Sequence, residues 1–265
     1  MYSRQLDERP ASVGSVADAE RLVARAVAAA TSADGDSRVR ILQTLLDQLT
    51  ETDSLEALCR ELKTTGRYAE YAYRHNNGFF VLFLTNPEIG FQSRVHIWLP
   101  GRTSPERPHR HRMAFVSRVV AGELTSIHFE RCALGEPAPS DALYEETIIN
   151  APARTNFDAP DAEFQPQQTV VLREICTRHY RAGDAYYFPA AEIHRVVTPP
   201  MLSSPNITLT VWDIPFQESI AYEPRGSADT APARKQVQRL SASTFSELWE
   251  VLLGTLEASR QGGGR

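Results

Sequence analysis

The sequence predicts a mostly β protein, a small antiparallel barrel or sandwich with helices at both ends. Apolar residues recur at helical spacing before residue 66, whereas the apolar period shortens toward two from Arg67 onward. The later segments are rich in β-branched and aromatic residues and follow one another without intervening helices, which is typical of sandwiches and barrels. A last apolar stripe at helical spacing begins near Ser243.

Three helices are predicted in an N-terminal segment over residues 1–66. Ser15 followed by Asp18 is typical of a helix start, and a second helix follows from Ser37 with a strongly amphipathic stripe. Asp53 and Glu56 are expected to cap the third helix. We expect the apolar stripes of these helices to be packing surfaces against the barrel, with no chemistry of their own.

The expected barrel occupies residues 67–222. Its predicted strands cover 78–85, 92–99, 112–121, 124–131, 168–180, 185–188, 194–198 and 208–214. Residues 133–164 are rich in Pro, Ala, Asp and Glu and predict a surface excursion, either a lid or a passive loop, with one irregular strand over 143–149. A linker over 223–242 and a terminal helix over 243–260 complete the chain.

Two histidines near the middle of the chain have the spacing of metal ligands. Side chains two apart in a strand point to the same face, so His109 and His111 present their imidazoles to one point. His194 enters an apolar, β-branched run that a second strand can place opposite the first pair. Three neutral nitrogens suit Fe, Zn, Ni or Cu, which predicts a metal site.

The segment around these ligands resembles the first motif of the cupin superfamily, small β-barrels that hold a metal between facing strands. His109 and His111 match the two histidines of that motif, and Gly122 matches its glycine. Phe115 occupies the position of the family's glutamate. A phenyl ring cannot coordinate a metal, so the resemblance implies a site without a carboxylate ligand.

The second cupin motif is matched about sixty residues later. Gly183, Pro189 and His194 fall on its glycine, proline and histidine, whereas Ala191 replaces its second glycine and Thr198 its asparagine. The resemblance covers residues 80–215 and implies a cupin-type barrel, also called a double-stranded β-helix or jelly roll. It also implies similarity to the three-histidine cupins, which include the cysteine dioxygenases, with Fe(II) as the expected metal, Zn, Ni or Mn as alternatives, and a homodimer.

Two strands flanking the metal motifs carry candidate substrate-binding residues. Arg94, His96 and Trp98 share one face of the first strand, and Arg94 is the expected clamp for a substrate carboxylate. A face of the last strand carries Thr208, Thr210 and Trp212. We expect Trp212, together with Phe115, to shape the pocket.

Three further side chains are candidates near the site. Arg74 lies near the start of the predicted barrel. Cysteine dioxygenases have a substrate-binding Tyr and Arg in a similar position, so the resemblance makes Arg74 a candidate. Tyr186 and Tyr187 flank the second motif, and strand alternation turns one of them inward as a candidate catalytic donor. The same alternation is expected to turn Arg110 and Arg112 away from the metal.

Composition excludes several function classes. The net charge of −5 and the pI near 5.8 give no overall attraction to nucleic acids or anionic membranes. No apolar run approaches the roughly 18 residues of a spanning helix, and the first residues lack the apolar core of a signal peptide, so we expect a cytoplasmic protein. Three widely spaced cysteines argue against a disulfide framework.

Three classes of function remain. The first is a mononuclear non-heme iron oxygenase, resembling the dioxygenases, that acts with dioxygen on a small anionic metabolite such as a thiol, amino acid or keto acid bound directly to the metal. The second is an isomerase, hydrolase or decarboxylase that uses Zn, Ni or Mn as a Lewis acid. The third is a small-molecule sensor or an accessory module without catalysis, whose helical ends associate with a partner. Tight ligand binding that persists when His109 and His111 are replaced by Ala would indicate this class.

Overall fold

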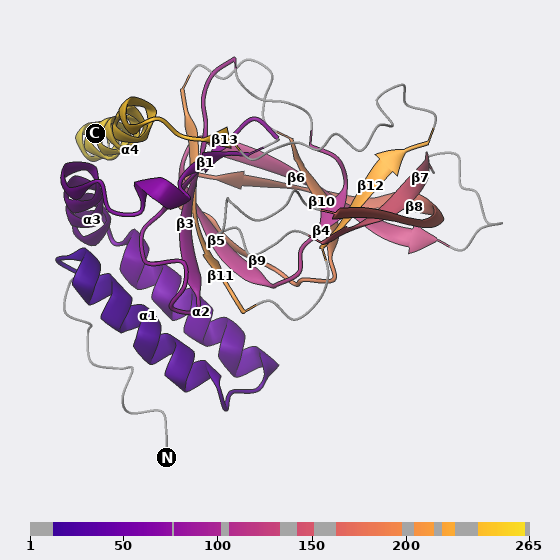
Figure 1. Ribbon diagram of the computed structural model, residues 1–265, viewed down its shortest axis with the longest axis horizontal. Coiled ribbons are helices and arrows are strands. Elements are labelled where there is room, and N and C mark those ends of the chain that lie inside the picture. The colour runs from indigo at the N-terminus through magenta and orange to yellow at the C-terminus, as the bar shows by residue number, and fades with distance from the viewer. Residues whose placement is uncertain are drawn as a thin grey trace.

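A layer of four helices covers one side of the protein (Figure 1). The computed structural model describes residues 13–75, 77–101, 106–132, 142–150, 163–197, 204–214, 219–225 and 238–262. Its helices are α1 (Val16–Ala30), α2 (Gly35–Thr50), α3 (Thr52–Thr65) and α4 (Ala242–Gly262), and a 3-10 turn η1 (Ala69–Tyr71) follows α3.

Side chains cap the first three helices. The hydroxyl of Ser15 accepts from the backbone N–H of Asp18 at the start of α1, as predicted. The cap of α2 is Asp34, which accepts from Ser37, so this helix begins before the predicted position. Glu51, rather than Asp53, caps α3 through its carboxylate. The predictions missed by one turn or less because apolar periodicity marks the middle of a helix more sharply than its ends.

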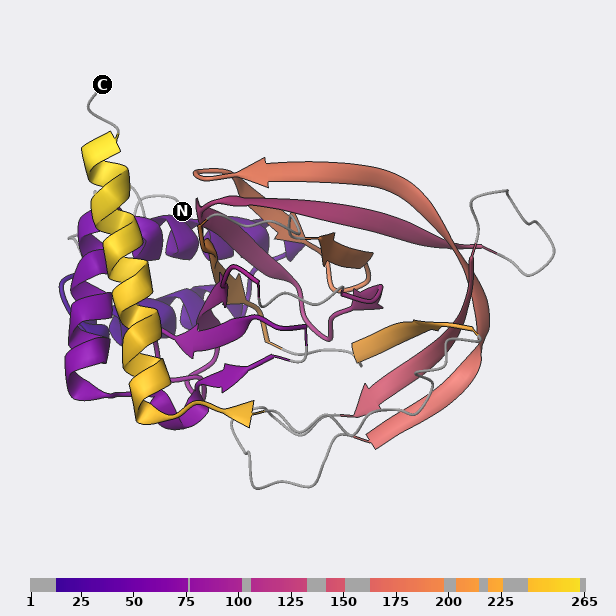
Figure 2. The ribbon, with the colours of Figure 1, turned by 90° about the horizontal axis from the view of Figure 1, so that it is seen from above.

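The first sheet has seven antiparallel strands and lies directly under the helices (Figures 1 and 2). Their order is β13-β1-β2-β3-β11-β5-β9. The strands are β1 (Tyr73–Arg74), β2 (Phe80–Phe83), β3 (Gln92–Trp98), β5 (Phe115–Ala121), β9 (Ala185–Phe188), β11 (Asn206–Trp212) and β13 (Gln238–Arg239).

The second sheet closes on itself in the order β10-β4-β12-β7-β8-β6. Its strands are β4 (His109–Arg110), β6 (Glu123–Cys132), β7 (Ala142–Asn150), β8 (Glu163–Arg181), β10 (Ile193–Val197) and β12 (Ser219–Pro224). Strands β6 and β8 form a long ribbon that extends away from the helical layer (Figure 2). The predicted fold class is confirmed, because the protein is mostly β, with two antiparallel sheets, N-terminal helices and a C-terminal helix.

Three short or late strands differ from the predicted pattern. The expected strand over 112–121 begins at Phe115, and the two-residue strand β4 precedes it. Strand β12 extends two residues past the expected end of the barrel, and β13 lies within the expected linker, where it pairs with β1. The irregular strand expected over 143–149 is present as β7. Of the other residues in 133–164, only 163 and 164 are described. The prediction of a lid or a passive loop therefore lies outside the described residues.

The main core lies between the helices and the first sheet. Leucines of α2 and α3 and the apolar residues of α4 pack with alternate residues of the central strands, among them Val95, Ile97 and Leu209. Burial of these side chains stabilises the sheet by roughly 25 cal/mol per Å² of apolar surface. Since alternate residues face opposite ways, Arg94, His96 and Thr208 face the second sheet. We call this the inner face of the first sheet.

No helix in the described part of the chain is both long enough and apolar enough to cross a bilayer.

Candidate metal centre and substrate cavity

Three histidines meet where the second sheet faces the inner face of the first. His109 lies on β4 and pairs with His194 on β10, and His111 follows directly after β4. Their ring centroids are 4.7 Å (His109–His111), 4.7 Å (His109–His194) and 5.0 Å (His111–His194) apart. One nitrogen of each ring lies within 4.8 Å of the others. The three predicted metal ligands are therefore brought together.

Backbone carbonyls orient two of the rings. The Nδ1 of His109 lies 2.9 Å from the carbonyl oxygen of Arg107, and the Nδ1 of His194 lies 3.4 Å from that of Glu192. A carbonyl oxygen only accepts, so each Nδ1 carries the hydrogen and each Nε2 keeps its lone pair. Such contacts behind metal-binding histidines fix the tautomer that coordinates.

Burial also favours the neutral form of His194. Desolvation lowers the pKa of His194 well below its ordinary value, and the nearby His109 lowers it further. A neutral imidazole is the form that binds a metal ion, so His194 needs no proton loss at neutral pH. The donor set of three neutral nitrogens fits a divalent first-row metal.

Aromatic rings surround the ligands where a fourth protein ligand would be expected. Phe115 lies 5.1 Å from the ring of His111 and 4.5 Å from that of Trp212. Trp212 also contacts His111 at 4.7 Å, and Phe188 stacks on His194 at 4.2 Å. No carboxylate of the described residues joins the histidine cluster. Ligand positions not filled by the protein are left to other molecules.

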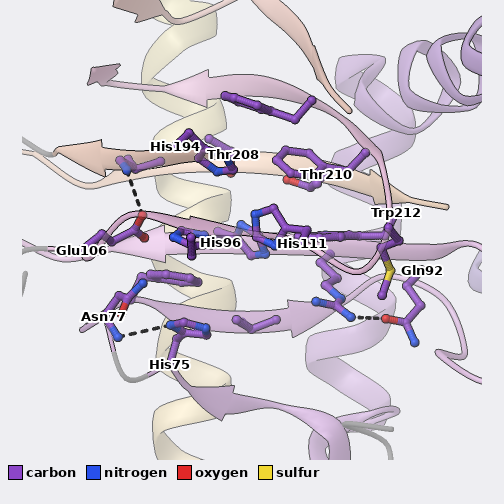
Figure 3. A pocket seen from close by; sticks show the side chains of 18 of the residues that line it. His75, Asn77, Gln92, His96, Glu106, His111, His194, Thr208, Thr210 and Trp212 are labelled. Carbon is purple, nitrogen blue, oxygen red and sulfur yellow. Dashed lines mark hydrogen bonds between the residues drawn. The ribbon is translucent and has the colours of Figure 1, made fainter. Parts of the chain in front are cut away.

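A cavity of about 160 Å³ adjoins the cluster. It is lined by the inner face of the first sheet on one side and by the three histidines on the other (Figure 3). Thr208 and Thr210 lie on β11 in this wall, beside His96 on the neighbouring strand β3. The volume suits a molecule of few heavy atoms.

Most predicted substrate-binding residues line this cavity. They are Arg94, His96, Trp98, Phe115 and Trp212. Arg94 is buried, donates to Gln92, and lies over the indole of Trp212 with its guanidinium carbon 4.8 Å from the ring centroid. Arg74 is exposed and does not line the cavity, because its neighbour Tyr73 takes the inward position on β1. The expectation for Arg74 is corrected on this point.

Strand β9 turns Tyr186 inward and Tyr187 outward. Tyr186 lines the cavity and stacks on Tyr180 at 4.2 Å, whereas Tyr187 is half-buried on the side of the helices. Desolvation raises the pKa of Tyr186, and the carboxylate of Glu106 adds to the rise. The Tyr186 hydroxyl therefore stays protonated and acts as a hydrogen-bond donor. The candidate role of Tyr187 in the cavity is corrected by this placement.

One of the two arginines beside the ligands also differs from expectation. Arg110 does not line the cavity, as expected from alternation on β4. Arg112 does line it, because β4 ends at Arg110 and the bend that follows does not alternate. The cavity wall therefore carries two arginines, Arg94 and Arg112.

Two ionisable residues on the cavity wall were not among the predicted site residues. Glu106 is buried and lines the cavity, and His75 lines it beside Phe79, on which its ring stacks at 4.3 Å. Glu106 stands in a loop without strand periodicity, three residues before His109, so only its closeness to the ligands could have marked it. His75 is half-buried and follows β1 directly.

No model of a known protein family matches the sequence, and no curated protein matches it. Among solved structures, the chain is similar to an RmlC-like cupin from Shewanella frigidimarina at 16% identity and a TM-score of 0.29, over 54% of this chain and 82% of that one. An oxalate decarboxylase from Lactobacillus farciminis is 13% identical at a TM-score of 0.30, and the match covers 57% of this chain and 32% of the decarboxylase.

The DMSP lyase DddQ from Ruegeria pomeroyi is 15% identical at a TM-score of 0.27, over 51% of this chain and 46% of the lyase. One of these neighbours, the Shewanella protein, is described as a cupin. At this identity and TM-score the likeness says nothing about substrate or reaction. The resemblance to cysteine dioxygenase stays a prediction.

Proposed function

We propose that the protein is a mononuclear non-heme iron oxygenase, of the dioxygenase type, that acts on a small anionic metabolite. The observation that carries the proposal is the cluster of His109, His111 and His194 with Phe115 where a carboxylate ligand would stand. Three neutral imidazoles leave the full charge of a divalent ion uncompensated, which favours an anionic ligand. They also leave up to three coordination positions for substrate and dioxygen.

The chain's own residues supply binding and orientation. Arg94 lies over the Trp212 indole, and His111 contacts the same indole. An anion held by Arg94 would therefore be close to a metal ligand. Aromatic side chains line the wall beside the ligands, and Tyr186 places a hydroxyl on the same wall. Bound Fe(II) would supply the activation of dioxygen, and the substrate the electrons that reduce it.

The test loads the protein with Fe(II) under anaerobic conditions and then measures its oxygen consumption in aerobic buffer. Panels of thiols, amino acids and keto acids are added in turn, with His111→Ala as the metal-site control. The proposal expects substrate-dependent oxygen uptake that is lost by at least about 100-fold in His111→Ala. Absence of uptake across every panel contradicts the proposal.

A metal-assisted reaction without redox change is the second candidate. It is favoured by the hydroxyl of Tyr186 on the cavity wall, a hydrogen-bond donor that can orient a substrate bound to a Lewis-acid metal. Metal analysis of protein purified without added metal separates the two candidates, since iron supports the first and zinc, nickel or manganese the second. The cytoplasmic location and a homodimer stay predictions.

A further inference from the structure

Glu106 is a buried carboxylate that the proposed reaction does not use. It is 8% exposed, it lines the cavity, and one of its oxygens accepts from the backbone N–H of Val196 at 2.8 Å (Figure 3). The other oxygen has no hydrogen-bond partner among the described residues. That oxygen can accept a hydrogen bond from a donor inside the cavity, and a charged donor makes the stronger bond.

The opposite charge lies at the other end of the cavity. Figure 3 places Glu106 and Gln92 at opposite ends, with His111 between them. Gln92 accepts from Arg94, so the guanidinium of Arg94 belongs to the Gln92 end. The cavity therefore has an anionic group at the Glu106 end and a cationic group at the Arg94 end, and His111 lies between them.

We propose that the ligand of this cavity is dipolar, with an anionic group at the Arg94 end and a protonated amine at the Glu106 end. The inference rests on the proposed function, because it takes the same cavity to be the substrate site. A protonated amine supplies both the charge and the donor that the second oxygen of Glu106 lacks. A simple monoanion would leave the second oxygen of Glu106 without a donor from the ligand.

The size of the cavity suits a short ligand. About 160 Å³ holds a molecule with the dimensions of an amino acid that has few side-chain atoms. The aromatic side chains of Trp98, Trp212 and Phe79 form one part of the wall. The class is therefore a small amine-bearing acid.

The test measures binding to the Zn(II)-loaded protein by calorimetry, so that no turnover occurs. Three matched pairs serve as probes: 3-aminopropionate with propionate, 4-aminobutyrate with butyrate, and 5-aminovalerate with valerate. We expect at least one amino acid to bind about tenfold or more tightly than its deaminated partner, as a charge-assisted hydrogen bond predicts. Glu106→Gln should remove that preference and leave the affinity for the deaminated acid within about threefold.

Three controls make the outcome decisive. Glu106→Gln keeps an oxygen for the Val196 N–H, so its fold and zinc content should match those of the unmodified protein. Glu123 is exposed, so Glu123→Gln should leave the preference for the amino acid over its deaminated partner unchanged. Equal binding within all three pairs, no binding of any probe, or a preference that survives in Glu106→Gln overturns the inference. If the monoanions still bind and oxygen uptake is seen, the proposed function stands without it.

Discussion

His194 is the ligand that joins the two halves of the metal centre. It lies opposite His109 on one neighbouring strand and opposite His128 on the other, and its ring is stacked on Phe188. Among the residues that the structure describes, only His109 and His111 share the cluster with it, whereas His128 is held by the carboxylate of Glu192. Removal of the His194 imidazole therefore leaves a pair of ligands, which is a weak site for any divalent ion.

His194→Ala should abolish stoichiometric metal binding while the protein stays folded, because the main core is built on the other sheet. Metal content after dialysis and near-UV circular dichroism measure the two effects. His179→Ala is the matched control, since His179 is exposed on β8 and contacts only Thr125 among the described residues. A fully metal-loaded His194→Ala protein would show that the ligand assignment is wrong.

At the scale of single residues, the two-residue period of a strand explains which cavity residues could be predicted from the sequence. Alternation placed Arg94, His96 and Trp98 on the face that lines the cavity. It could not decide between Tyr186 and Tyr187, because alternation separates neighbours without saying which side is inward. Glu106 was out of reach, because its position depends on a contact with the distant strand β10.

At the scale of elements, the turn between β5 and β6 depends on Gly122. Its φ of +78° is in the left-handed region, and a Cβ at this position would lie 1.8 Å from the Oδ1 of Asn206. Asn206 holds the turn from β11, since its amide donates to the carbonyl of Glu123 at 2.6 Å and accepts from the Glu123 N–H at 3.0 Å. The turn thus ties three strands of both sheets together.

Gly122→Ala should lower the free energy of unfolding by about 3 kcal/mol, because backbone strain and a clash with Asn206 act together. Gly66→Ala is the matched control: Gly66 has a similar φ of +65° but open space around it, so we expect about 1–2 kcal/mol. Urea denaturation measures both. Equal losses for the two variants would contradict the role given to Asn206.

Long strands with clear alternation were predictable, and short ones were not. β4 has two residues, too few to show a period, and it is defined by its pairing with β10 and β12. β13 is likewise short and depends on β1. Such strands exist through tertiary pairing, which a local pattern does not record.

At the scale of the whole molecule, an ion pair links the helical layer to the cavity wall. Arg38 of α2 donates to both oxygens of Asp213, at 2.6 Å and 2.7 Å. Asp213 is 5% exposed and directly follows Trp212, the indole that contacts His111 and Arg94. The helices therefore support the wall of the cavity as well as covering the sheet. Apolar stripes predicted that the helices pack on the barrel, but this pair spans 175 residues and left no local signal.

Arg38→Ala should lower the free energy of unfolding by roughly 2–3 kcal/mol, because it leaves the buried carboxylate of Asp213 without its partner. Arg118→Ala, which breaks a pair with the exposed Asp47, should cost less than about 1 kcal/mol. Chemical denaturation of both variants checks the difference. A smaller loss in Arg38→Ala than in Arg118→Ala would contradict the link described above.

The whole account depends on one ion shared by three imidazoles. Crystals of the metal-loaded protein, with diffraction data collected on either side of the metal's absorption edge, locate that ion directly. A single anomalous peak is expected about 2.1 Å from the Nε2 atoms of His109, His111 and His194. A peak elsewhere, or an ordered triad without a peak in metal-loaded crystals, would contradict it.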